Sequence, residues 1–193
     1  IIRKHRMKEK NMRILILGLD NAGKSSIVAR WLGDDQGSID MIAPTFGFEI
    51  HDIQCQEGYT ATVWDIGGQE SIRPFWRSYY EGETDAVCFV IDSADIDRIA
   101  EARRELEKVL MGTEETRQGS RGASVLIMAN KQDLKDAHCI DEIKERLDLD
   151  LFSSTEHDMH IMPCSAMHDA ASCRQGLSWI VESVRRKRSP GAM

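Results

Sequence analysis

The stretch that most constrains the fold of this 193-residue chain is GLDNAGKSS, which runs from Gly18 to Ser26. It fits the phosphate-loop pattern G-x-x-x-x-G-K-[ST] and follows an apolar run, MRILILG, at residues 12–18. A loop of this kind joins a buried strand to a helix, because its backbone N–H groups surround phosphates at the helix N-terminus. The stretch therefore predicts a strand, a loop and a helix that begins near Lys24.

The rest of the chain alternates short apolar runs with amphipathic stretches. Four of the six apolar runs are almost continuous, as expected for strands covered on both faces. The other two alternate and are separated by Glu57-Gly58, a hairpin-turn signal. We therefore expect an α/β fold with a mostly parallel six-stranded sheet, one antiparallel hairpin and helices on both faces. The further strands are predicted at 46–53, 60–66, 86–92, 124–130 and 159–164, and the further helices are predicted to begin near Ile72, Ile96, Ile140 and Ser172.

Composition narrows the classes of partner. The chain is 41% hydrophobic and 30% charged with a net charge of -7, which argues against nucleic-acid binding as its main role. No apolar run approaches the roughly 18 residues that a membrane span needs. The five cysteines are scattered without a C-x-x-C pair, which predicts reduced thiols and a cytoplasmic protein.

The loop's chemistry comes from its backbone and from two side chains. Lys24 is placed to neutralise the β- and γ-phosphates of a nucleoside triphosphate, and the Ser25 hydroxyl is placed to bind Mg²⁺. The Asp20 side chain need not face the phosphates, because backbone N–H groups surround them. The loop alone does not distinguish ATP from GTP, or a kinase from a switch. Residues expected to hold the phosphates are Gly18, Leu19, Asp20, Asn21, Ala22, Gly23, Lys24, Ser25 and Ser26.

Two later strands end in motifs that predict guanine recognition. In MANKQD, the Asp133 carboxylate can accept hydrogen bonds from both N1–H and the 2-amino group of guanine, which adenine does not offer. The stem of Lys131 can lie over the base, and Asn130 can connect this loop to the phosphate loop. In CSA, which contains Ser165, the backbone N–H of Ala166 can donate to guanine O6.

The stretch WDIGGQE predicts the γ-phosphate end of the site. Asp65 ends a strand and can hold Mg²⁺ through water, while the Gly68 N–H can contact the γ-phosphate. Gln69 follows where a side chain can orient an attacking water molecule. Upstream, in APTFGF, the Thr45 hydroxyl can bind Mg²⁺ only while a γ-phosphate is present.

These motifs, in this order, resemble those of small GTPases over residues 12–187. GLDNAGKSS, PTFGF, WDIGGQE, RPFWRSYY and NKQDL are similar to the ADP-ribosylation factor (Arf) and Arf-like branch. The resemblance implies the P-loop NTPase (small G-protein) fold and a switch between GTP and GDP, in which the second and third strands slide. It implies slow, Mg²⁺-dependent hydrolysis, with Gln69 and Lys24 as catalytic residues and Ser25, Thr45 and Asp65 around the metal. A phosphoryl-transfer kinase is disfavoured, because it would need a lid of arginines and would not need the guanine-binding motif NKQD.

The resemblance also implies protein partners. Phe48, Trp64 and Tyr79 match the branch's aromatic triad on the effector surface, although three aromatic residues more often belong to a core than to an interface. No arginine lies in the phosphate loop, and Arg73 falls in the segment after Gln69 that we expect to be mobile. We therefore expect a GTPase-activating protein to supply an arginine.

The leading stretch RKHRMKEKNMRILILGLDNAGK narrows the resemblance to one Arf-like subgroup. That subgroup is connected with tubulin folding cofactors, microtubule regulation and the release of lipidated cargo from a carrier protein. An alternative is a GTP-dependent binding module that acts with a tubulin-folding chaperone and hydrolyses little GTP.

We divide the chain into a basic N-terminal helix (1–11), a GTPase domain (12–187) and a C-terminal tail (188–193). The sequence starts with Ile1, so we expect the native start to be missing. The thin apolar stripe of the leading helix favours partner contact or solvent over firm membrane binding. The basic run RRKR at 185–188 is interpreted as a solvated helix end.

Three segments depart from the Arf pattern, and we expect them to alter loop shape and partner choice without affecting the nucleotide site. They are GDDQGSIDMIAPT at 33–45, GTEETRQGSRGAS at 112–124 and MHDAAS at 167–172.

Overall fold

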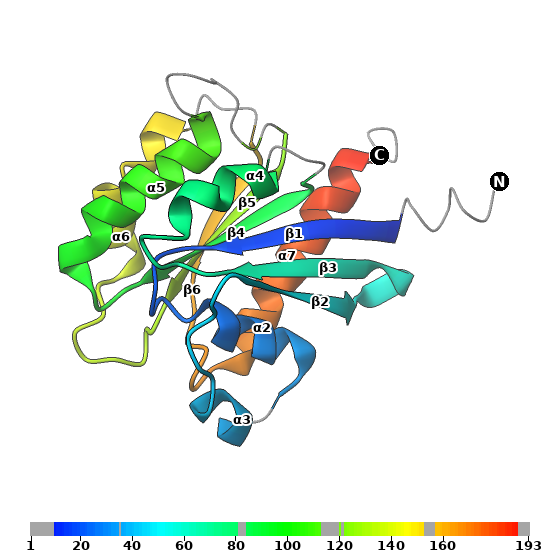
Figure 1. Cartoon of the computed structure of the whole chain (residues 1–193), viewed down its shortest axis with the longest axis horizontal. Helices are drawn as coiled ribbons and strands as arrows, with labels where there is room; N and C mark the ends of the chain where they lie inside the picture. The colour runs from blue at the N-terminus through cyan, green and yellow to red at the C-terminus, as the bar shows by residue number, and fades with distance from the viewer. Residues whose placement is uncertain are drawn as a thin grey trace.

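The computed structural model describes residues 10–34, 36–80, 84–112, 120, 122–152 and 157–188. Its centre is a six-stranded sheet in the order β2-β3-β1-β4-β5-β6 (Figure 1). β2 is antiparallel to β3, and the other neighbours are parallel, which confirms the predicted fold. The strands are β1 (Asn11–Leu17), β2 (Phe48–Gln54), β3 (Thr60–Ile66), β4 (Ala86–Asp92), β5 (Ser124–Asn130) and β6 (Met159–Pro163).

The helices are α2 (Lys24–Leu32), α3 (Gln36–Asp40), α4 (Trp76–Tyr80), α5 (Ile99–Met111), α6 (Ile140–Leu147) and α7 (Ala170–Arg188). Single 3₁₀ turns lie at Gln56–Gly58, Arg73–Phe75, Ile96–Arg98 and Leu149–Phe152. The predicted starts at Lys24 and Ile140 are those of the structure, and 3₁₀ turns precede α4 and α5 where helices were predicted to begin. α3 was not predicted, because its five residues QGSID contain a glycine and have no helical apolar pattern.

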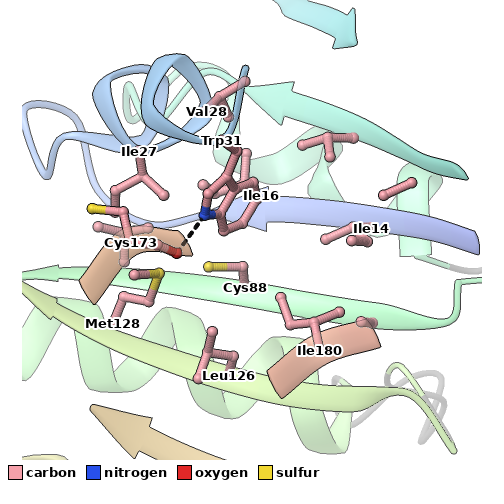
Figure 2. Packing of buried hydrophobic residues seen from close by; sticks show 14 of the residues in the cluster. Ile14, Ile16, Ile27, Val28, Trp31, Cys88, Leu126, Met128, Cys173 and Ile180 are labelled. Carbon is pink, nitrogen blue, oxygen red and sulfur yellow. Dashed lines mark hydrogen bonds between the residues drawn. The ribbon is translucent and has the colours of Figure 1, made fainter. Parts of the chain in front are cut away.

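Two buried clusters hold the helices on opposite faces of the sheet. Side chains of α2 and α7 belong to one cluster, and those of α4, α5 and α6 belong to the other. Figure 2 shows the first cluster, where Trp31 of α2 donates from Nε1 to the carbonyl oxygen of Cys173 at 2.7 Å. This bond satisfies the buried indole N–H and joins the helix after the phosphate loop to the last helix.

The strands differ in burial as their sequences predict. β5 is buried at all seven of its positions, whereas β2, at the edge of the sheet, is buried only at Ile53. The turn between β2 and β3 has Glu57 and Gly58 at φ 55° and 73°, the left-handed conformation that the hairpin signal requires. Two cations hold this turn. Lys10 donates to Glu57 O at 2.7 Å, and Arg185 forms an ion pair with the Glu57 carboxylate at 2.6 Å.

The basic side chains at the end of α7 are partly exposed, and they also contact residues of other elements. Besides the Arg185 pair, Arg186 pairs with Asp158, and Lys187 donates to the carbonyl oxygen of Gly122 at 2.9 Å. Arg188 donates to Asn11 O at 2.8 Å and pairs with Asp85 at 2.6 Å. The interpretation of a merely solvated helix end is therefore incomplete, because these cations anchor α7 to the ends of neighbouring strands.

Parts of two predictions lie outside the described residues. Of the predicted N-terminal helix at 1–11, only Lys10 and Asn11 are described, and Asn11 begins β1. Of the predicted tail at 188–193, only Arg188 is described, and it ends α7. Most of the departure at 112–124 also lies outside. Among the described residues, no helix is both long and apolar enough to cross a membrane.

Candidate nucleotide-binding and hydrolytic site

The predicted motifs meet at one edge of the sheet. The loops after β1, β3, β5 and β6 lie together because these strands are parallel and end on the same side. A cavity of about 430 Å³ opens there, and the phosphate loop lies along one side of it. It is lined by Asp20, Asn21, Gly23, Lys24, Ser25, Ser26, Ile42, Ala43, Pro44, Thr45, Phe46, Gly67, Gly68 and Gln69.

Lys24 is the buried cation of this cavity. Its Nζ donates to the carbonyl oxygens of Gly18 at 3.0 Å and Leu19 at 2.9 Å, so the side chain folds back over its own loop. Burial lowers the pKa of Lys24 to about 8, against the opposite effect of Asp65 and Asp20. A partly desolvated amine at the start of a helix is well placed to bind an anion.

Three oxygen-bearing side chains converge beside Lys24. Ser25 Oγ donates to Asp65 Oδ2 at 2.5 Å and lies 2.9 Å from Thr45 Oγ1. Burial raises the pKa of Asp65, and its Oδ1 is buried with no hydrogen-bond partner among the described residues. An unpartnered buried carboxylate oxygen is unfavourable unless a cation binds it. The site therefore fits Mg²⁺, which prefers hard oxygen ligands, although Ser25, Thr45 and Asp65 now bond to one another.

Gly68 brings the segment after β3 against the phosphate loop. A Cβ at Gly68 would lie 2.4 Å from Gly18 O and 2.5 Å from Asp20 N, so this approach excludes any side chain. The next residue, Gln69, donates from Nε2 to Thr45 O at 3.1 Å. Its Oε1 is buried and has no hydrogen-bond partner among the described residues, which leaves it able to accept from a water molecule.

The Asp20 carboxylate is paired with two arginines. Its Oδ1 lies 3.1 Å from Nη2 of Arg73 and 3.1 Å from Nη1 of Arg98. Burial acts to raise the pKa of Asp20, but the charge of Arg98 and hydrogen bonds from both arginines hold that pKa below its ordinary value. Arg73, which was expected to lie in a mobile segment, has a side chain that is only 7% exposed and is bonded on three sides in this structure.

The base-recognition residues are held by one buried hydrogen bond and by contacts that are partly buried. Asn130 donates from Nδ2 to Ala22 O at 2.8 Å, so the expected connection to the phosphate loop is present. Lys131 has a left-handed backbone (φ 66°), and its Nζ pairs with Asp92 at 2.6 Å. Asp133 accepts from Ser165 Oγ at 2.5 Å, which orients its carboxylate.

Ala166 lies beside these residues with its N–H already engaged. The N–H expected to face guanine O6 donates to Asn130 Oδ1 at 3.0 Å. Donation to O6 would require this hydrogen bond to be exchanged, so the assignment of Ala166 to the base stays a prediction.

Two further residues near the base end were missed by sequence reasoning. Arg30 is buried and donates to the carbonyl oxygens of Ala166 at 2.7 Å and Met167 at 2.8 Å, which anchors the CSA loop to α2. His168 has Nε2 3.9 Å from Asp133 Oδ2, a contact that becomes an ion pair only when the ring is protonated. No local signal marks either residue, because an arginine on a helix or a histidine in a polar loop is usually solvated.

The departures from the Arf pattern do reach the site, contrary to our expectation. In the segment 33–45, which we call the long link, Ile42 and Ala43 line the cavity, and Gln36 of α3 accepts a hydrogen bond from Arg30. In the segment 167–172, Met167 and His168 make the contacts just described.

The predicted aromatic triad is a real cluster. The ring centroids of Phe48, Trp64 and Tyr79 lie 5.3 to 6.0 Å apart, and the Arg13 guanidinium lies 4.5 Å from the Trp64 ring centre. Phe48 is 45% exposed and the other two rings are partly buried, so the cluster is neither core nor free surface.

Comparison with known proteins agrees with this arrangement. The sequence model of the ADP-ribosylation factor family matches residues 1–184. The chain belongs to this family. The ADP-ribosylation factor-like protein 2 of Dictyostelium discoideum is 45% identical over 184 residues, 95% of this chain and 93% of that protein. The protein of the same name in Arabidopsis thaliana is 42% identical over the same shares of both chains.

A solved structure supports the fold of this Arf-family chain. The structure of the Arl6 BBS3 small GTPase from Trypanosoma brucei, with the bound nucleotide analogue GppNp, superposes with a TM-score of 0.78 at 29% identity. The match covers 92% of this chain and 99% of that one. The predicted resemblance to Arf-like small GTPases is confirmed, and the subgroup that the leading stretch indicated is the one that contains ADP-ribosylation factor-like protein 2. Members of this family are GTP-binding switches and GTP hydrolases.

Proposed function

We propose that this protein is a Mg²⁺-dependent GTP/GDP switch that hydrolyses GTP slowly and binds effectors in its GTP state. The observation that carries the proposal is the convergence of Ser25, Thr45 and Asp65 beside the buried Lys24 and the unpartnered Oε1 of Gln69. These groups come from three separate motifs, and each has a distinct use toward a nucleoside triphosphate. Bound Mg²⁺ would neutralise phosphate charge at the three oxygens.

Lys24, Gly68 and Gln69 have separate roles in the proposed hydrolysis. Lys24 binds the β- and γ-phosphates, and the Gly68 N–H contacts the γ-phosphate. Gln69 accepts a hydrogen bond from the attacking water and holds it in line with the γ-phosphate. The residues that line the cavity include no arginine, and both Arg73 and Arg98 are occupied by Asp20. Intrinsic hydrolysis is therefore slow, and an arginine from an activating protein accelerates it by roughly 10³–10⁵-fold.

The test is single-turnover hydrolysis of preloaded GTP. Gln69→Leu removes the amide that orients water, and we expect the rate to fall roughly tenfold or more. Glu70→Gln is the matched control, because Glu70 is the exposed next residue and does not line the cavity. Equal rates for Gln69→Leu and the wild type would contradict the proposal.

The partners follow from the family and the aromatic cluster. We assign effector binding to the surface of Phe48, Trp64 and Tyr79, because a partly exposed tryptophan between two rings is a strong binding anchor. We further propose a cytoplasmic role with a tubulin folding cofactor or a carrier of lipidated cargo, as the resemblance of the sequence motifs to this Arf-like subgroup implies. Trp64→Ala should remove binding of the GTP-loaded form to such a partner, whereas Trp179→Ala, on the opposite side of the sheet, should preserve it.

The alternative function is a GTP-dependent binding module that works with a tubulin-folding chaperone and hydrolyses little GTP. It is favoured by the absence of an arginine among the residues that line the cavity. Single-turnover hydrolysis with and without cell extract separates the two, since only a switch is accelerated by an activating protein in the extract.

A further inference from the structure

Arg73 forms hydrogen bonds to the backbone on both sides of the Gln69 α-carbon. Its side-chain Nε donates to the carbonyl oxygen of Gly68 at 2.6 Å, and its backbone N–H donates to the carbonyl oxygen of Gln69 at 3.2 Å. The N–H of Asp20 also donates to Gly68 O, at 3.1 Å, and that of Ile72 donates to Gln69 O, at 2.8 Å. Because each peptide unit is planar, holding these two oxygens sets the two dihedral angles at Gln69.

Arg73 is in turn held by two carboxylates from different parts of the fold. Nη1 pairs with Glu101 of α5 at 2.5 Å, and Nη2 pairs with Asp20 of the phosphate loop at 3.1 Å. Arg98 supports the same carboxylate of Asp20 and is itself paired with Asp95 at 2.6 Å. The planar guanidinium therefore reaches three partners from three different nitrogens, whereas a lysine has a single nitrogen from which to donate.

Each of the three nitrogens of the Arg73 guanidinium group makes one of these bonds, and Arg73 is not among the residues that line the cavity. An arginine that stabilised the γ-phosphate directly would have to abandon these contacts. The arrangement instead suits a residue that acts through its neighbour.

We propose that Arg73 is a positioning residue that holds Gln69 for hydrolysis, with Asp20 and Glu101 as its anchors. The acidic residue of the phosphate loop then serves the reaction through Arg73 and not by contact with the phosphates. This inference rests on the proposed role of Gln69.

The main test compares Arg73→Lys with the wild type in single-turnover hydrolysis of preloaded GTP. The lysine keeps the charge but loses the bond to Gly68 O, and we expect the rate to fall roughly tenfold. GDP affinity and thermal stability should change far less than the rate. Arg104→Lys is the matched control, because Arg104 is exposed on the same helix as Glu101. The Arg104→Lys variant should hydrolyse GTP at the wild-type rate.

Two more variants locate the effect. Glu101→Gln, which lies outside the phosphate loop, should lower the rate by roughly threefold, and it serves as the test if Arg73→Lys does not fold. In a Gln69→Leu background, Arg73→Lys should cause no further fall, because Arg73 acts through Gln69.

The outcomes separate this inference from the proposed function. If Gln69→Leu hydrolyses GTP normally, the proposed function fails. If Gln69→Leu is impaired but Arg73→Lys is not, only the positioning role is overturned. The role is also overturned if Arg73→Lys lowers GDP affinity and melting temperature in step with the rate, or lowers the rate further in the Gln69→Leu background.

Discussion

The base end and the γ-phosphate end of the site are held together in different ways. At the base end, Asn130 and Arg30 are buried and join β5, α2 and the CSA loop through direct hydrogen bonds. At the γ-phosphate end, Thr45 precedes Phe46, which is 87% exposed, and Thr45 is held through the same polar groups that would bind Mg²⁺.

This difference suggests which end responds to the nucleotide. The bonds from Arg30 to Ala166 and from Asn130 to Ala22 use no group that is assigned to guanine. We therefore expect the base end to be preformed, apart from the Ala166 N–H that guanine O6 would have to win from Asn130. The contacts of Thr45 compete with those of a metal ion, so the order of the γ-phosphate end depends on what the site holds. The predictions below test this division, from the largest expected effect to the smallest.

Asp133→Asn should remove guanine recognition at the preformed end. An amide cannot accept from both N1–H and the 2-amino group, and we expect GTP and GDP affinity to fall alike, on the order of 10⁴-fold. Competition between guanine and xanthine nucleotides measures the change, and xanthine should now be preferred. Asp136→Asn, at an exposed position nearby, is the control. Unchanged GTP affinity in Asp133→Asn would reject the base-reading role.

Gly68→Ala should damage only the γ-phosphate end. The new Cβ would overlap backbone atoms of the phosphate loop at 2.4 Å, so the segment cannot close against it. We expect the preference for GppNp over GDP to fall by about 10- to 100-fold, as for other overpacked contacts. Equilibrium binding of both nucleotides measures this, with the exposed Ser71→Ala as control. An equal loss for GDP and GppNp would show that the two ends are not separable.

Arg30→Met should loosen the base end while keeping the bulk of the side chain. The carbonyl oxygens of Ala166 and Met167 would lose a buried, charged donor, and we expect roughly tenfold weaker binding of GTP and GDP alike. Isothermal titration of both nucleotides checks this, with Arg174→Met, exposed on α7, as control. A selective loss of GTP would place Arg30 in the γ-phosphate end instead.

Raising the pH should weaken phosphate binding without any mutation. Lys24 must be protonated to bind phosphates, and burial has lowered its pKa to about 8, so its charge is lost as the pH rises through that value. GDP affinity should therefore fall about fourfold between pH 7 and pH 8.5. Binding of GDP measured across this range checks the sign, and constant affinity would show that Lys24 remains charged.

Much of the fold could be predicted because its signals are local. The β3, β4 and β5 bounds agree with the predicted runs, since near-continuous or alternating apolar residues mark strands directly. The structure of the long link at 33–45 could not be predicted from the sequence. Its helix α3 has no periodic apolar pattern and depends on contacts such as that between Gln36 and Arg30.

For the site, the sequence by itself determined which motifs would meet, because each one follows a strand and parallel strands end at the same edge of the sheet. Only the tertiary structure decided the direction of the Asp20 side chain, the burial of Arg73 and the anchoring role of Arg30. Arg73 meets Asp20 across 53 positions and Arg30 meets Ala166 across 136, and such pairings between distant charges and carbonyl groups have no local pattern. They form because a buried guanidinium must find acceptors, and the packed fold determines which acceptors are within reach.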